Sequence, residues 1–320
     1  MERILVIGAN GQIGSELVEA LAKQHGEQNV IATDISPVNK YNAARYQVLN
    51  VMDKAALEAL VAAEGITQVY QLAAMLSATG EAAPLKAWDL NMDGLLNILE
   101  VARERGEQGK PLRIFWPSSI AAFGPNTPAE NTPQYTVMDP TTIYGISKLA
   151  GERLCEYYFL KYGVDVRSIR YPGIISFKSP PGGGTTDYAI AIFHAALRGE
   201  RYDCFLGPKT TLPMIYMPDA IRATIELMDA PASQIKIRSS YNVAGVSFNP
   251  EELAAAITRA LPDFKIAYTP DSRQAIADSW PRSLDDSKAT EDWNWKAKIG
   301  VEEMVKDMLE NIDVSLSEAA

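Results

Sequence analysis

The chain has 320 residues, of which 47% are hydrophobic, so it can bury one large core or two smaller ones as a globular protein does. Its formal net charge of -10 argues against nucleic acid or an anionic membrane as partner, because such partners need a basic surface. Two cysteines, Cys155 and Cys204, are too few for a disulfide framework or a thiolate zinc site. No apolar run approaches the ~18 residues of a membrane span. We expect reduced thiols and a cytoplasmic protein that starts at Met1.

Short apolar runs alternate with helical patterns through the first half of the chain. The runs are expected strands and lie at 4–7, 30–33, 46–49, 68–72, 112–116 and 166–170. Strands that are apolar along their whole length are typical of a parallel sheet with helices on both faces. The sequence therefore predicts an α/β fold with a doubly wound parallel sheet of the Rossmann type and a second, smaller α/β domain.

A stretch rich in proline, glycine, serine and threonine at 179–186 ends this alternation. We expect a first domain at 1–172 with return segments at about 213–245, and a second domain at 173–212 and 246–320. Two long helical patterns, at about 84–105 and 140–162, carry apolar residues on more than one face. A subunit contact could bury this surplus.

A glycine-rich turn follows the first strand and opens a helix expected at 12–23. Gly8, Gly11 and Gly14 let the backbone approach a pyrophosphate, whose charge the helix N-terminus can hold. Asp34 ends the second strand, where a carboxylate can bind the adenosine ribose hydroxyls and repel a ribose phosphate. NAD is therefore predicted in preference to NADP, although a plain strand-to-helix turn would explain the glycines alone. The expected cofactor contacts are Gly8, Asn10, Gly11, Gln12, Ile13, Gly14, Asp34, Asn50, Val51, Leu72, Ala73, Ala74, Tyr144, Lys148, Tyr171, Pro172 and Ile174.

Tyr144 and Lys148 lie four residues apart, so on a helix they share one face. The ammonium favours the ionised phenol over its unperturbed pKa of roughly 10, and a phenolate can act as a general base. Ser119 ends the fifth strand, at the sheet edge where such folds bind ligands. A packed helix tyrosine is the alternative for Tyr144. The two histidines, His25 and His194, can build neither a Ser/His/Asp triad nor a metal site, so no metal is expected.

The glycine turn, the terminal acid, the serine at the strand end and the tyrosine/lysine pair, in this order, resemble the extended short-chain dehydrogenase/reductase family. The resemblance implies that Ser119, Tyr144 and Lys148 form the catalytic group. Tyr144 would take the hydroxyl proton as hydride leaves for the nicotinamide, and Ser119 would bond the same oxygen. Lys148 would lower the tyrosine pKa and hold the nicotinamide ribose. The family also implies a homodimer through the two long helices.

Segments after the sixth strand point to a subfamily. Nucleotide-sugar enzymes of the family carry Arg-Tyr-Phe-Asn at 170–173, whereas this chain has Arg-Tyr-Pro-Gly. That segment, the run at 180–188 and the run at 278–285 resemble the short-chain L-threonine 3-dehydrogenases. The resemblance implies zinc-independent oxidation of L-threonine to L-2-amino-3-ketobutyrate with NAD. The expected substrate contacts are Ser77, Thr79, Ser118, Ser119, Tyr144, Gly184, Thr185, Thr186 and Trp280.

The chemistry of an amino acid agrees with these residues. Glycine amides and the hydroxyls of Thr185 and Thr186 at a helix start are suitable donors for a carboxylate. Backbone carbonyls, or the hydroxyls of Ser77 and Thr79, could accept from the ammonium. The alternative for the glycine run is a flexible linker. Two other functions stay open, namely a nucleotide-sugar epimerase with tightly bound NAD and a non-catalytic NAD-sensing module.

Overall fold

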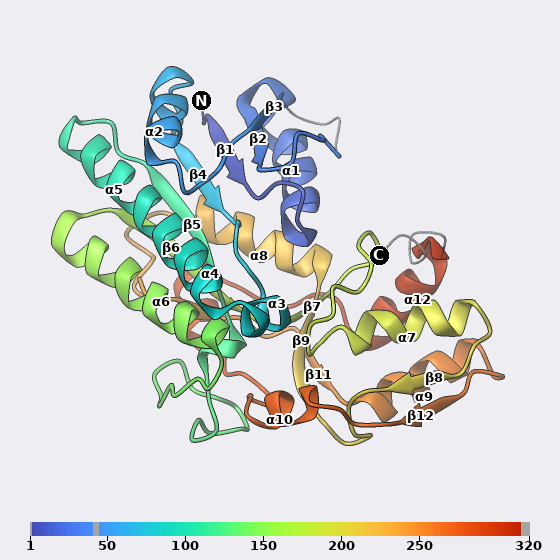
Figure 1. The fold of residues 1–320 in the computed structure, drawn as a ribbon. Helices are drawn as coiled ribbons and strands as arrows, with labels where there is room; N and C mark the ends of the chain where they lie inside the picture. Colours follow the sequence, from blue (N-terminus) through green and yellow to red (C-terminus); the bar gives the residue numbers. More distant parts are fainter. Residues whose placement is uncertain (1, 41–44, 315–320) are drawn as a thin grey trace. The chain divides into compact units, whose positions relative to one another are not determined.

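The computed structural model describes residues 2–40 and 45–314, which divide into two compact units (Figure 1). The first unit spans Met1–Ala122, Thr142–Arg170 and Ile221–Tyr241, and the second spans Phe123–Thr141, Tyr171–Ala220 and Asn242–Ala320. The sequence-based limits differ from these ranges mainly at 123–141, which the prediction assigned to the first domain. In the structure this segment packs within the second unit, where Thr132 forms a bridge with Leu284.

The first unit is built on a seven-stranded sheet in the order β10-β6-β5-β4-β1-β2-β3. Its strands are β1 (Ile4–Ile7), β2 (Val30–Asp34), β3 (Arg45–Val48), β4 (Gln68–Gln71), β5 (Arg113–Ser119), β6 (Asp165–Tyr171) and β10 (Tyr241–Asn242). β1 pairs in parallel with β2 and β4, and β3 and β5 continue the sheet in parallel on either side. The predicted doubly wound sheet is confirmed, and each predicted strand overlaps an observed one. The strand order reverses at β1, which is where such sheets bind ligands.

Helices cover both faces of this sheet. They are α1 (Gln12–His25), α2 (Lys54–Ala63), α3 (Ser77–Ala82), α4 (Pro84–Trp88), α5 (Gly94–Glu107), α6 (Ile143–Tyr162) and most of α8 (Met217–Asp229), with the short turns η1 (Glu27–Asn29), η2 (Asp89–Asp93) and η3 (Ile120–Ala122). Figure 1 shows α2, α5 and α6 side by side, with α1 on the other face. Buried side chains of α2, α5 and α6 form one core with those of β1, β2, β4 and β5.

The long pattern at 84–105 is not one regular helix. α4 passes directly into the π-turn η2 and then into α5, so the predicted helical pattern runs without a break but contains one π-helical turn. Asn91 in this turn accepts from the Met75 amide at 2.8 Å and donates to the Met75 carbonyl at 3.1 Å and the Ser147 hydroxyl at 3.2 Å. The turn therefore ties the segment after β4 to α6, in keeping with the frequent use of π-turns near functional sites.

α6 begins at Ile143, three residues later than predicted, because Thr142 caps it. The Thr142 hydroxyl accepts from the Gly145 amide at 3.1 Å, and Gly163 ends the helix with a φ of 70°. Gly151 allows close packing, since a Cβ there would stand 2.4 Å from the Trp116 ring. As a result, α6 lies directly against β5.

The second unit is a smaller α/β arrangement. Its elements are β7 (Gly173–Ile175), α7 (Tyr188–Leu197), β8 (Tyr202–Cys204), β9 (Leu212–Tyr216), β11 (Val246–Phe248), α9 (Pro250–Ala260), β12 (Ile266–Tyr268), α10 (Arg273–Asp278), α11 (Ser287–Trp293) and α12 (Val301–Asn311). β9 lies between β7 and β11, and β8 pairs with β12. Both cysteines, Cys155 in α6 and Cys204 in β8, are free and buried. Among the described residues, no helix is both long enough and apolar enough to cross a membrane.

A carboxylate at the start of β6 holds the return segment of the first unit. Asp165 accepts from Arg167 at 2.9 and 3.1 Å and from Arg113 at 3.4 Å, and it also pairs with Arg238. The buried Arg167 side chain in turn donates to three carbonyls at the end of α8. Burial would raise the pKa of Asp165, but its bonds to Arg167 and Arg238 outweigh burial and hold that pKa below its usual value.

The Asp165→Asn change should lower the free energy of unfolding at pH 7 by about 2 kcal/mol, because buried guanidinium groups lose their counterion. Since the folded pKa is depressed, this stabilisation is present above the unfolded pKa and is lost as pH falls through the folded one. The difference from wild type in urea unfolding should therefore shrink as the pH approaches 3. Glu291→Gln, in an exposed pair with Lys288, is the control and should cost less than about 0.5 kcal/mol. Equal losses in both variants would contradict the role of Asp165.

Candidate active site

The glycine-rich turn between β1 and α1 is shaped to receive a phosphate group. Gly8 has a φ of 82°, and a Cβ on Gly14 would stand 2.2 Å from the Gly8 carbonyl oxygen. α1 starts after Gly11 with no side chain capping it, so a ligand can take the place of a cap at its first amides. A Cβ on Gly8 would stand 2.7 Å from the Ala73 nitrogen, which places the segment after β4 against the turn.

Asp34 ends β2 beside this turn. Its carboxylate accepts from the amides of Asn10 at 3.1 Å and Ser36 at 3.2 Å. The Asn10 side chain donates to the Val38 carbonyl at 3.0 Å and the Tyr46 hydroxyl at 3.1 Å, which fastens the loop after β2 onto the turn. Asp34 stays partly exposed, so the residues present fit the adenosine and pyrophosphate parts of a dinucleotide.

The remaining predicted cofactor contacts are placed as follows. Asn50 is exposed after β3, and its side chain accepts from the Met52 amide at 3.0 Å. Val51 is buried, and its carbonyl accepts from Asn97 at 2.9 Å. Gln12, Ile13, Leu72, Ala73 and Ala74 are partly buried in the first unit, and Tyr171, Pro172 and Ile174 belong to the second. The individual contacts to the cofactor stay predictions.

Replacing Asp34 by serine should shift the preference from NAD toward NADP, because the carboxylate that repels a ribose phosphate is lost. We expect the ratio of NAD affinity to NADP affinity to fall at least about tenfold, which corresponds to one charge-assisted interaction. Fluorescence titration with each nucleotide measures the ratio. Asp263→Ser, on an exposed turn, should leave it unchanged. An unaltered ratio in the Asp34 variant would remove this residue from the cofactor site.

Ser119, Tyr144 and Lys148 come together in the first unit, at the end of β5 and in the first two turns of α6. The Ser119 hydroxyl accepts from the Ala121 amide at 3.1 Å and is near enough to the Tyr144 phenol to lower its pKa. The Lys148 ammonium lies 5.5 Å from the centroid of the Tyr144 ring and 4.5 Å from that of the Trp116 ring, and it donates to the Pro117 carbonyl at 2.6 Å. The helix thus brings hydroxyl, phenol and ammonium side by side at the carboxyl edge of the sheet.

The ionisation of these groups differs from the sequence-based expectation. Burial raises the pKa of Tyr144 to about 12, against a lowering by its Ser119 bond. Burial likewise lowers the pKa of Lys148 to about 7, against the raising effects of Cys155 and Glu152. The pKa of the phenol was predicted to be lowered, whereas in the protein chain alone it is raised, because burial disfavours both charged forms and the lysine loses part of its charge near neutral pH.

Sequence reasoning did not single out Glu152, which lies one helical turn beyond Lys148. Glu152 is fully buried, accepts from the Ser118 hydroxyl at 2.6 Å, and is bonded by Arg170 through Nε at 2.9 Å and Nη2 at 2.8 Å. The spacing of 144, 148 and 152 is the signal that could have found it, since these positions share one helix face. Ser118 was predicted to bind substrate, but its hydroxyl hydrogen is used on Glu152. A substrate contact by Ser118 stays a prediction.

Ser77 and Thr79 lie in α3, next to the start of α6. Glu81 of the same helix accepts from the Ile143 amide at 2.8 Å, so α3 packs one residue from Tyr144. Ser77 is buried and Thr79 is exposed. This neighbourhood supports a role of α3 in holding a substrate, while the contact itself stays a prediction.

The other predicted substrate residues lie in the second unit, and they are Gly184, Thr185, Thr186 and Trp280. Asp187 accepts from the amides of Gly182 at 2.7 Å and Gly184 at 2.8 Å. The proposal that these two amides bind a substrate carboxylate therefore needs correction, because a carboxylate of the protein already takes them. Thr185 and Trp280 are buried, and Thr186 packs against Gly173, where a Cβ would stand 2.6 Å from its methyl group. Substrate contacts by these residues stay predictions.

The two histidines belong to other elements than β5 and α6, which carry the predicted catalytic group. His25 is the last residue of α1, and His194 is buried in α7, where burial and Arg198 lower its pKa. Within residues 2–40 and 45–314, no three His, Cys, Asp or Glu side chains are grouped to hold a metal ion.

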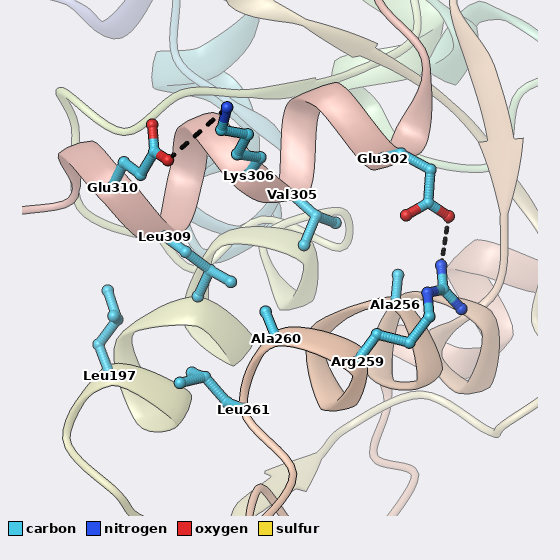
Figure 2. A pocket seen from close by; sticks show the side chains of 10 residues that line it. All are labelled: Leu197, Ala256, Arg259, Ala260, Leu261, Glu302, Val305, Lys306, Leu309 and Glu310. Carbon is cyan, nitrogen blue, oxygen red and sulfur yellow. Dashed lines mark hydrogen bonds and ion pairs between the residues drawn. The ribbon is translucent and has the colours of Figure 1, made fainter.

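A hollow of about 420 Å³ lies on the second unit, beside α7, α9 and α12 (Figure 2). Three leucines and two charged pairs are among the side chains that line it. Figure 2 labels these as Leu197, Leu261, Leu309, Arg259 with Glu302, and Lys306 with Glu310. None of the predicted site residues lines this hollow.

The sequence matches the NAD dependent epimerase/dehydratase family over residues 4–244. The chain belongs to this family. The matched range includes the glycine turn, Asp34, and all three residues of the catalytic group.

Several relatives are similar along nearly the whole chain. An uncharacterized epimerase/dehydratase of Staphylococcus saprophyticus is 47% identical over 317 residues, or 98% of each chain. The mitochondrial L-threonine 3-dehydrogenase of Bos taurus is 45% identical over 311 residues, which cover 96% of this chain and 82% of that protein. A solved structure, the holo form of the GalE-like L-threonine dehydrogenase from Cupriavidus necator, is 60% identical with a TM-score of 0.94 and covers 97% of this chain and 99% of its own.

Proposed function

We propose that this protein is an NAD-dependent L-threonine 3-dehydrogenase, which oxidises L-threonine to L-2-amino-3-ketobutyrate and releases NADH. The observation that carries the proposal is the Ser119/Tyr144/Lys148 group, placed at the same sheet edge as the nucleotide-binding turn. The choice of L-threonine among alcohols is supported by the similarity to L-threonine dehydrogenases along the whole chain.

NAD supplies the hydride acceptor for this reaction. Uncapped amides at the start of α1 would hold its pyrophosphate, and Asp34 would bind its adenosine ribose. These groups would hold the adenosine and pyrophosphate parts of the cofactor, and side chains at the carboxyl ends of β4 and β5 would then be available to its nicotinamide part.

The residues of the chain handle the proton. The Tyr144 phenolate accepts the proton of the threonine hydroxyl, the Ser119 hydroxyl bonds the same oxygen, and the Lys148 ammonium stabilises the phenolate. Because the pKa of Tyr144 is raised to about 12 in the chain alone, the phenolate at neutral pH requires added positive charge. Turnover should therefore rise with pH until the phenol is ionised in the complex with oxidised cofactor.

Tyr144→Phe should lower kcat for L-threonine by about 10² to 10⁴-fold, because the proton acceptor is removed. NAD affinity should change less than about threefold, since the ring and the turn at Gly8 are retained. NADH absorbance and nucleotide titration measure the two quantities. Tyr162→Phe, near the exposed end of α6, is the matched control and should keep full activity. Undiminished turnover in the Tyr144 variant would exclude this residue as the base.

The same assay separates the alternative functions. A dehydrogenase forms one NADH for each L-threonine oxidised. An epimerase with tightly bound NAD would interconvert nucleotide sugars without net NADH, and a sensing module would bind NAD without turnover of either substrate. Net NADH with another secondary alcohol but none with L-threonine would leave the dehydrogenase chemistry standing and remove the substrate.

We also propose that two copies associate through the face formed by α5 and α6. On α6 the side chains of Leu160 and Tyr157, three residues apart and so on one helix face, are 75% and 45% exposed, and neighbouring exposed apolar groups mark interaction surfaces. Light scattering should give twice the 35.0 kDa of one chain, and Leu160→Glu should give the mass of one. A wild-type protein of single-chain mass would exclude the dimer.

We further propose a cytoplasmic location, which is supported by the two free buried thiols.

A further inference from the structure

Three successive residues at the end of β5 each interact with α6. Pro117 is hydrogen-bonded to Lys148 and Ser118 to Glu152, both at 2.6 Å, and Ser119 lowers the pKa of the Tyr144 phenol. Gly151 makes this register possible, because any larger residue would collide with the Trp116 ring. Lys148, Ser119 and Tyr144 already have roles in the proposed reaction, whereas the bond between Ser118 and Glu152 has none.

Glu152 is held as a buried carboxylate on both of its oxygens. Arg170 donates to Oε1 at 2.9 Å and to Oε2 at 2.8 Å, and Ser118 donates to Oε1. The side chains of Glu152 and Arg170 are 0% and 2% exposed. Burying such a pair is costly, and apolar residues of similar size would pack as well or better. A role other than packing therefore has to explain why a charge stands one turn from Lys148.

We propose that Glu152 is a positioning residue, which holds Lys148 charged and in place and locks the end of β5 onto α6. This inference rests on the proposed function of the Ser119/Tyr144/Lys148 group. Through Ser118, Glu152 restrains the peptide whose carbonyl, that of Pro117, receives the lysine ammonium. Through its charge, it favours the protonated form of a lysine that burial would otherwise neutralise.

The charges around Lys148 make Glu152 the anion that matters. On α6 the lysine faces Tyr144, Glu152 and Cys155, and from β6 Arg170 lies behind Glu152. Burial raises the pKa of the Cys155 thiol, and burial also raises that of the Tyr144 phenol, so both groups are neutral at pH 7. Removing the carboxylate alone would leave Lys148 near the cation of Arg170, with no other anion close to it among the residues that the structure describes.

Glu152→Gln keeps the size of the side chain and removes its charge. In the wild type, the NMR titration of the Lys148 Cε, assigned by comparison with Lys148→Arg, should show a midpoint near the pKa of about 7. In the variant this midpoint should fall by at least about one pH unit, because the cation has lost its nearest anion. This readout needs no substrate, so it tests Glu152 even if the proposed function is wrong.

With NAD saturating, the pH profile of kcat/KM for L-threonine gives the second readout. A less protonated Lys148 makes the phenolate harder to form. In Glu152→Gln, the rise of kcat/KM on the acid side of the profile should therefore occur about one unit higher in pH. At pH 7 the variant should be at least about tenfold slower and should regain part of that loss as pH rises, while KM for NAD changes less than about threefold. If Glu152 had only a structural role, the variant would lose activity equally at all pH values, and the pH at which kcat/KM rises would not change.

Glu156→Gln, one turn further along α6 in an exposed pair with Arg153, is the matched control and should move neither readout. The double variant Glu152→Gln/Arg170→Met also removes the Arg170 cation that the single variant leaves without its carboxylate partner. It replaces the single variant in both measurements if the single variant does not fold. Its Lys148 midpoint should still fall, by less than in the single variant.

An unchanged Lys148 midpoint in the single variant, or in the double variant if only that one folds, overturns the proposal. A shifted midpoint in a protein that does not oxidise L-threonine would instead retain the role of Glu152 and refute the substrate. The two failures are therefore distinguishable.

Discussion

The contact between β5 and α6 is the constraint on which the site depends. A glycine in the helix admits the Trp116 ring, and hydrogen bonds then set the register between strand end and helix. A shift of one residue along either element would separate the serine hydroxyl from the phenol. The proton chemistry proposed for this protein is therefore a consequence of packing, and the ion pair of Glu152 with Arg170 lies inside that packed contact.

Burial explains why the site is poorly ionised in the chain alone. It opposes charge on the phenol and on the ammonium, so the pKa of Tyr144 rises while that of Lys148 falls. Positive charge on an oxidised nicotinamide would favour the phenolate, which couples proton removal to the presence of the cofactor in its reactive state. Such coupling protects a buried base from acting before the hydride acceptor has arrived.

The nucleotide turn and the proton-handling group both belong to the first unit, at the carboxyl ends of neighbouring parallel strands. The second unit contributes a loop whose conformation is held from within. Asp187 occupies the amides of Gly182 and Gly184, so this carboxylate organises the glycine run that the sequence alone left as either a binding loop or a linker.

The sequence by itself determined the fold class, the strands of the first unit and the dinucleotide turn, because these depend on local spacing. Gly8, Gly14 and Asp34 could be assigned from position alone, and the interval between Tyr144 and Lys148 placed both on one helix face. The π-turn at Asn91 and the pairing of Glu152 with Arg170 and Ser118 were decided only by the tertiary structure, since their partners are distant in sequence. The direction of the pKa shifts was decided there too, because burial is a property of the packed chain and local spacing carries no information about it.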